Sequence, residues 1–134
     1  MTEDFSKYNG EGTVLRKAQT KMLEILVEVD KVCRKHNIMY WIDYGTLLGA
    51  IRHGGFVPWD DDMDICMITE DYNRFQQIVP KELPSHLFLQ TEKSDPSAQV
   101  GIGNMRVRDD STLCIFGCEN FNNNYHKGVF IDIF

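Results

Sequence analysis

The stretch GTLLGAIRHGGFVPWDDDMDI, from Gly45 to Ile65, places four aspartates within five positions, directly ahead of an apolar run that looks like a strand. Carboxylates this close repel one another by about a few kcal/mol at the effective dielectric of a protein surface. Folding must overcome that repulsion, or a positive partner must neutralise it. The four acids are Asp60, Asp61, Asp62 and Asp64.

Length and charge limit the classes of protein to consider. The chain has 134 residues, 43% of them hydrophobic and 25% charged, which is ordinary for a single globular domain. Its net charge of −6, with no basic stripe, disfavours nucleic acid as a partner. A nucleotide remains compatible with this charge, because a metal ion can bridge acidic side chains and phosphate.

The two ends of the sequence and its cysteines indicate where in the cell the protein is expected. The N-terminus lacks the pattern of a signal peptide, and no apolar stretch is long enough to span a bilayer. Cys114 and Cys118 have no second pair or suitably spaced histidine to complete a zinc site. We therefore expect reduced thiols and a cytoplasmic protein, with contact to the inner membrane face left open. The bare apolar strand at 128–134 predicts the N-terminal portion of a longer protein.

Hydrophobic periodicity predicts an α+β domain, with a long N-terminal helix and a small mixed β-sheet flanked by helices. Apolar residues recur every three or four positions in the first helix, and alternate in the strands. We expect helices at 13–36, 47–53 and 69–79, strands at 38–43, 62–68, 86–91, 99–108, 112–116 and 128–133, and a polar loop at 117–127.

The aspartates suggest a divalent cation. Residues two apart in a strand face the same side, about 6.6 Å from each other, so Asp62 and Asp64 would point to one place and Met63 into the core. Asp60 joins them if the strand begins early. Magnesium, or manganese, suits such a site, because it takes one or two carboxylates and completes its shell with water and phosphate. The alternative is a solvated acidic turn. Ile65 stands where an EF-hand needs glycine, which excludes that calcium site.

Asp132 is the third candidate ligand. It lies inside the apolar run Val-Phe-Ile-Asp-Ile-Phe, where a lone carboxylate is costly unless it is paired or bound to metal. If this strand lies beside 62–68, Asp132 joins the same cation site.

Several residues could bind phosphate. Gly45 and Thr46 form a turn between a strand and a helix, where free N–H groups and the helix dipole favour anions. Arg52 and His53 close the short helix, and Arg106 lies on a later strand. Each of the three also has a structural alternative: favourable charge at a helix C-terminus for the first two, and a routine exposed strand arginine for the third.

The block YGTLLGAIRHGGFVPWDDDMDI, preceded by CRKHNIMYW and followed later by GVFIDIF, closely resembles the LicD family of phosphorylcholine-transferase-like proteins, related to fukutin. The resemblance implies one nucleotidyltransferase-like domain over 1–134. It places Gly45 and Thr46 on the Gly-Ser-type turn, Asp62 and Asp64 on the metal-binding D-x-D, and Asp132 on the third acidic position.

Other residues of that block also match the family: Arg52, His53, Trp59 and Asp60. Tyr44 departs from it, since glycine or aspartate is expected there.

The resemblance implies metal-dependent transfer of a phospho-alcohol from a CDP-activated donor such as CDP-choline, with release of CMP. The acceptor would be a hydroxyl of a cell-surface glycan, such as lipopolysaccharide or teichoic acid, or of its lipid-linked precursor. Asp62 and Asp64 would bridge the metal ions, and Asp132 would hold the acceptor-side ion and take the hydroxyl proton. Asp60, Arg52, His53 and Arg106 would contact substrate. Two alternatives stay open: a nucleotidyltransferase acting on a small alcohol, and a non-catalytic nucleotide- or metal-binding module.

Overall fold

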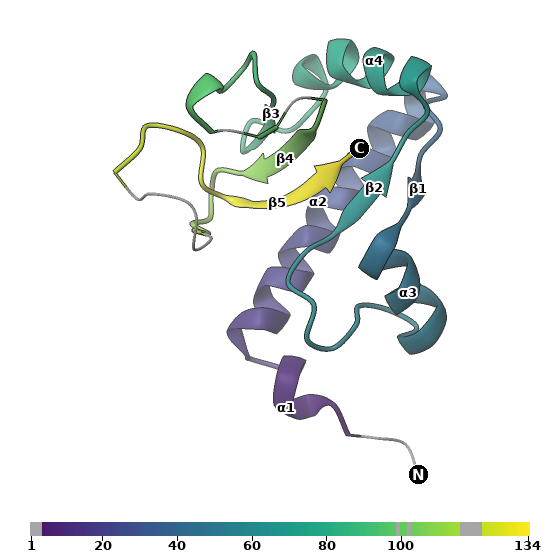
Figure 1. The fold of residues 1–134 in the computed structure, drawn as a ribbon, viewed down its shortest axis with the longest axis vertical. Helices are drawn as coiled ribbons and strands as arrows, with labels where there is room; N and C mark the ends of the chain where they lie inside the picture. Colours follow the sequence, from purple (N-terminus) through teal and green to yellow (C-terminus); the bar gives the residue numbers. More distant parts are fainter. Residues whose placement is uncertain (1–3, 99, 102, 116–121) are drawn as a thin grey trace.

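The computed structural model describes residues 4–98, 100–101, 103–115 and 122–134. In these residues the fold is a mixed five-stranded sheet with four helices, and the predicted α+β class with a long N-terminal helix is confirmed (Figure 1). The helices are α1 (Ser6–Asn9), α2 (Val14–His36), α3 (Tyr44–His53) and α4 (Thr69–Ile78), with short 3-10 turns η1 (Val79–Lys81) and η2 (Pro96–Ala98). The strands are β1 (Trp41–Ile42), β2 (Asp64–Cys66), β3 (Leu87–Gln90), β4 (Met105–Asp109) and β5 (Val129–Ile133).

The strand order in the sheet is β1-β2-β5-β4-β3. The pairing of β2 with β5 is parallel, and the other three pairings are antiparallel. The last strand of the chain therefore lies at the centre of the sheet, between two strands that precede it (Figure 1). This insertion brings the D-x-D segment and the C-terminal segment side by side.

Helix α2 runs along one face of the sheet (Figure 1). Its period-3.6 apolar stripe predicted that packing. The Thr13 hydroxyl caps the helix by accepting the N–H of Arg16, and Asn37 ends it in a left-handed conformation. The buried apolar side chains of the stripe join the core of the sheet: Met22, Ile25, Val29, Val32 and Cys33.

Helix α3 begins at Tyr44, earlier than the expected 47, because Asp43 caps it by accepting the N–H of Tyr44. The first strands are shorter than expected, since β1 holds only two residues and β2 three. Helix α1 and the η2 turn carry too few residues to show a period, and the sequence did not predict them.

The prediction was also wrong in the second half of the sheet. The strand expected at 99–108 begins only at Met105, because Gly101 and Gly103 turn the chain at φ 93° and 79°. Residues 112–115 are not a strand, and the N–H of Thr112 instead closes a turn onto the carbonyl of Asp109. Residues 116–121, which include Cys118 and part of the expected polar loop, lie outside the described residues. Among those described, no helix has the length and apolarity needed to cross a bilayer.

Gly49 lets the returning chain pack against α3. A Cβ at this position would lie 2.5 Å from the carbonyl oxygen of Gly55 and 2.7 Å from the backbone nitrogen of Val57. Both neighbours are backbone atoms and cannot rotate away. The close approach fixes where the chain returns after α3, and hence where the aspartates begin.

We expect Gly49→Ala to lower the free energy of unfolding by about 2 kcal/mol, since the new methyl group forces apart two backbone segments. Urea denaturation measures the change. Gly55→Ala is the matched control: a Cβ there meets nothing within 4 Å, so we expect a change within about 0.5 kcal/mol. Equal stability of the two variants would contradict the packing argument.

Candidate active site

A row of polar side chains crosses the sheet. Asp64 on β2 is the register partner of Asp132 on β5, which in turn is the partner of Arg106 on β4. The row extends to Gln90 on β3 at one end. At the other, the N–H of Asp43 donates to the carbonyl of Asp64 at 3.2 Å. Side chains in register on neighbouring strands share one face. Asp64 and Asp132 therefore lie side by side, as the sequence predicted if the two strands paired.

Arg106 is the cation of this row. Its Nε donates to Oδ1 of Asp132 at 2.8 Å, and its guanidinium lies 4.4 Å from the ring centroid of Phe130. Burial raises the pKa of Asp132, and the ion pair with Arg106 opposes that rise. Arg106 thus offsets the negative charge of the Asp132 carboxylate in this structure. Its assignment to substrate phosphate stays a prediction.

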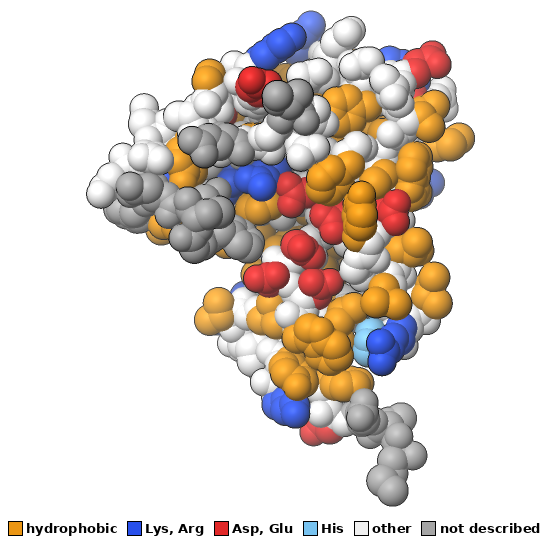
Figure 2. Space-filling view, viewed as in Figure 1, with side chains coloured by type: hydrophobic (Ala, Val, Ile, Leu, Met, Phe, Trp, Pro, Cys, Tyr) orange, Lys and Arg blue, Asp and Glu red, His pale blue; other side chains and the backbone are white. Residues whose placement is uncertain are grey.

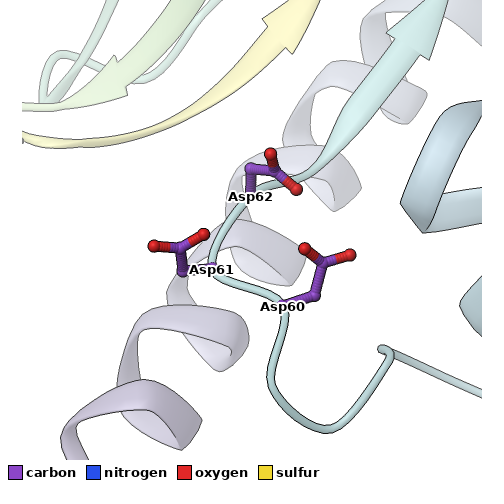
Figure 3. A group of neighbouring side chains, drawn as sticks. All are labelled: Asp60, Asp61 and Asp62. Carbon is purple, nitrogen blue, oxygen red and sulfur yellow. The ribbon is translucent and has the colours of Figure 1, made fainter.

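Three aspartates cluster on the segment that leads into β2. We call residues 57–62 the acidic loop. One carboxylate oxygen from each of Asp60, Asp61 and Asp62 lies within 4.8 Å of the others (Figure 3). In the part of the chain that the structure describes, no other set of three or more acidic, histidine or cysteine side chains brings its ligand atoms this close together. The predicted ligand set was Asp62, Asp64 and Asp132. The structure places Asp60, which we expected to contact substrate or to join the cation site, in one group with Asp62 and with Asp61, which the sequence did not single out.

The electrostatics of the acids indicate uncompensated negative charge. Burial, followed by the carboxylates of Asp62 and Asp61, raises the pKa of Asp60 to about 6. Burial, followed by the carboxylates of Asp62 and Asp132, raises the pKa of Asp64 to about 6. Acidic side chains gather in the middle of one face of the molecule, between apolar patches (Figure 2). Clustered carboxylate oxygens of this kind fit a hard divalent cation such as magnesium or manganese.

The start of α3 adjoins the acids. The Asp43 carboxylate takes the N–H of Tyr44, and the described residues supply no acceptor to the N–H groups of Gly45 and Thr46. The Thr46 hydroxyl accepts the N–H of Asp64 at 2.8 Å, which leaves its own proton to donate. These donors and the helix dipole make a favourable position for phosphate beside the carboxylates.

Gly45 packs closely against the acidic loop. A Cβ at this position would lie 2.5 Å from Oδ2 of Asp60. The absence of a side chain therefore lets the Asp60 carboxylate pack against the first turn of α3.

Arg52 and His53 lie at the other end of α3. Arg52 follows Gly45 by seven residues, about 10 Å along the helix axis. The His53 ring packs edge-on against Phe5 and Trp59, at centroid distances of 5.6 and 6.2 Å. The structure does not bring these two residues to the acids, and their contact with substrate stays a prediction.

Asp43 is a site residue that sequence reasoning missed. It joins the row beside Asp64 and contributes to the raised pKa of that carboxyl group. The signal was present, because aspartate directly before a helix is a preferred N-cap.

Residues 37–114, more than half of the chain, match the family LicD/FKTN/FKRP, nucleotidyltransferase domain. The chain belongs to this family. The match includes α3, the acidic loop and Asp64. Helices α1 and α2 up to residue 36, and β5 with Asp132, lie outside the matched segment.

Individual members of the LicD family align over shorter segments. The chain is 42% identical over 77 residues to the lipopolysaccharide cholinephosphotransferase LicD of Haemophilus influenzae, covering 58% of this chain and 29% of that protein. It is 43% identical over 68 residues to the uncharacterized protein RT0683 of Rickettsia typhi, covering 51% and 22%. It is 44% identical over 41 residues to the human ribitol 5-phosphate transferase FKRP, covering 31% and 8%. The chain thus spans less than a third of the length of each of these relatives.

The raised pKa of Asp64 predicts a pH-dependent effect of its removal. A carboxyl group whose pKa is raised in the folded state contributes stability below its unfolded value of 3.8 and loses it as pH rises to about 6. In metal-free protein we expect Asp64→Asn to raise the free energy of unfolding by about 2 kcal/mol at pH 7 and by much less at pH 4. Urea titrations across this range test it.

Asn73→Ala, an exposed change on α4 that removes no titratable group, is the control for that series. Its difference from the unsubstituted protein should not vary with pH. If the change in free energy of unfolding caused by Asp64→Asn is also the same at every pH, the charged Asp64 carboxylate does not destabilise the folded protein.

Tyr44 has a backbone conformation that suits glycine. Its φ is 49°, in the left-handed region, and its ring packs edge-on against Phe134 at 5.7 Å. Glycine or aspartate was the residue expected here from the family block. The conformation supplies a physical reason for glycine, since a Cβ is disfavoured at this φ.

We expect Tyr44→Gly to be more stable than Tyr44→Ala by about 1 kcal/mol, as measured by thermal or urea unfolding. Both variants lose the contact with Phe134, so the difference isolates the backbone conformation. Alanine as stable as glycine would indicate that the position carries no strain.

Proposed function

We propose that this domain transfers a phospho-alcohol from a CDP-alcohol donor, such as CDP-choline, to a hydroxyl group of a cell-surface glycan or its lipid-linked precursor, with release of CMP. The observation that carries the proposal is the placement of Asp64 next to Asp132, beside the free donors at the start of α3. Membership of the LicD family supports the reaction class. The transferase names of LicD and FKRP support a phospho-alcohol as the transferred group.

Different residues of the chain would bind the metal and the donor phosphate. Asp62 and Asp64 would bridge magnesium or manganese, with Asp60 as a further ligand and Asp132 on the acceptor side. When bound, the metal would neutralise the phosphate oxygens and the developing charge on the leaving group. Thr46, through its hydroxyl and N–H, would hold a donor phosphate. Positioning and charge neutralisation are the main requirements of phosphoryl transfer, and this arrangement supplies both.

The covalent step is a displacement at phosphorus. The acceptor oxygen forms a bond to the phosphorus that carries the alcohol, and the bond from that phosphorus to the oxygen of CMP breaks. The acceptor hydroxyl gives its proton to Asp132, and CMP leaves with the electron pair. Arg106 holds the Asp132 carboxylate at 2.8 Å, so that it faces the acceptor in one orientation. A cytoplasmic site, with access to the inner membrane face, would bring together the nucleotide donor and a lipid-linked acceptor.

Titration calorimetry with Mn²⁺, followed by CDP-choline, tests the ligand assignment. We expect Asp64→Asn and Asp132→Asn each to weaken Mn²⁺ binding by about tenfold or more, because each removes a charged ligand. CDP-choline binding should then require the metal. Glu70→Gln is the matched control, since it also removes one negative charge but lies exposed on α4.

Turnover separates the alternatives. CMP released from CDP-choline in the presence of Mg²⁺ and an acceptor glycan supports the transferase. Pyrophosphate released from CTP would instead indicate a nucleotidyltransferase, and binding without any turnover a non-catalytic module. Loss of Mn²⁺ affinity in Asp61→Asn, with no loss in Asp64→Asn, would place the metal on Asp60, Asp61 and Asp62 alone and overturn the ligand assignment.

A further inference from the structure

Gln19 is a buried amide in the second turn of α2, fully removed from solvent. A buried amide is costly unless its donors and acceptor are hydrogen-bonded. Its Nε2 donates to the carbonyl of Asp60 at 2.8 Å and to that of Val57 at 3.4 Å. Its Oε1 accepts from Nδ2 of Asn9 at 2.9 Å. The amide therefore links the last residue of α1 and the second turn of α2 to the main chain of the acidic loop.

Aromatic residues in and directly before α1 also contact Trp59, the residue that precedes Asp60. The rings of Phe5 and Tyr8 pack edge-on against Trp59, with centroid distances of 5.9 and 5.4 Å. Such aromatic pairs stabilise beyond the area that they bury. Trp59 is thus held through its side chain and Asp60 through its carbonyl.

Few other bonds hold this segment. Among the described residues, the backbone of residues 58–62 makes one backbone hydrogen bond, from the N–H of Asp60 to the carbonyl of Val57, which is local to the turn. Bonding to β5 begins at Met63, whose carbonyl accepts the N–H of Asp132. The position of the acidic loop relative to the sheet therefore depends strongly on Gln19, while its carboxylates repel one another.

We propose that Gln19, with its amide oriented by Asn9, is the positioning residue that holds the acidic loop in register with Asp64 and Asp132 for cation binding. The proposal rests on the proposed function for the metal that the loop would help to bind. Neither residue lies in the segment that matches the LicD family, which begins at residue 37. The N-terminal helices of this chain are thereby assigned a part in its active site.

The test compares Gln19→Met with Gln77→Met, an exposed glutamine on α4. Methionine keeps the length of the side chain and removes both hydrogen-bonding ends. In metal-free protein we expect amide hydrogen exchange within residues 56–63, read at the hydrogen-bonded N–H of Asp60, to become about tenfold faster in Gln19→Met, the factor expected for loss of its buried hydrogen bonds. Exchange in β4 and β5 should stay unchanged, and Gln77→Met should match the unsubstituted protein throughout.

Mn²⁺ affinity, followed by electron paramagnetic resonance, supplies the functional readout. We expect it to fall about tenfold in Gln19→Met and less in Asn9→Leu, which leaves the bond to Asp60 intact. Asn9→Leu also carries both measurements if Gln19→Met fails to fold, with the same direction expected.

Unchanged exchange at 56–63, or exchange that rises equally in β4 and β5, would show that Gln19 does not specifically hold the loop and would overturn the proposal. Faster exchange with unaltered Mn²⁺ affinity would overturn the positioning role. If the unsubstituted protein binds no Mn²⁺, the proposed metal function fails and the cation-binding part of this inference fails with it. The exchange result still decides separately whether Gln19 holds the loop.

Discussion

The burial of Asp64 on the sheet beside Asp132 is the constraint on which the rest of the site depends. Parallel pairing of β2 with β5 puts these residues opposite each other, so the backbone cannot move one carboxylate away without breaking the sheet. Arg106 compensates Asp132 from the next strand. No such cation faces Asp64 among the described residues, and burial, followed by the carboxylates of Asp62 and Asp132, raises its pKa to about 6. The divalent cation that we propose would turn this unfavourable arrangement into a binding site.

The core beneath the acids resists that repulsion. Ile65 and Ile133 directly follow Asp64 and Asp132, and both isoleucines are fully buried against α2 and the rest of the core. Burying such a side chain stabilises by about 1.5–3 kcal/mol, which is comparable to the electrostatic cost of holding an acid beside another. Alternation along each strand therefore couples the two effects: the residues that anchor the strands to the core also fix the carboxylates on the opposite face.

The sequence predicted the parts of the site that depend on local pattern. Asp132 was conspicuous because it interrupts an apolar run, and α2 because its apolar stripe has a helical period. The pairing of Arg106 with Asp132 could not be predicted, because it depends on β4 lying beside β5, and strand order is not a local property. The place of Asp61 beside Asp60 and Asp62 was missed for another reason: the chain there is a loop, so the alternation assumed for a strand does not apply. Gln19 carried no signal, since a glutamine on a helix is ordinarily solvated.

The place of β5 in the sheet links folding to the formation of the site. This strand comes last in the sequence and yet lies between β2 and β4. Without it the sheet would consist of two separate pairs, β1 with β2 and β3 with β4, and Asp64 would lose its neighbour Asp132 on β5. Contacts between segments so distant in sequence form late, because closing the intervening loop costs entropy before the contacts can compensate. Asp132 and its neighbour Asp64 meet only when β5 inserts, so the same event completes both the core and the carboxylate row. The structural unit of this site therefore extends beyond residue 114, where the family match ends, to include β5.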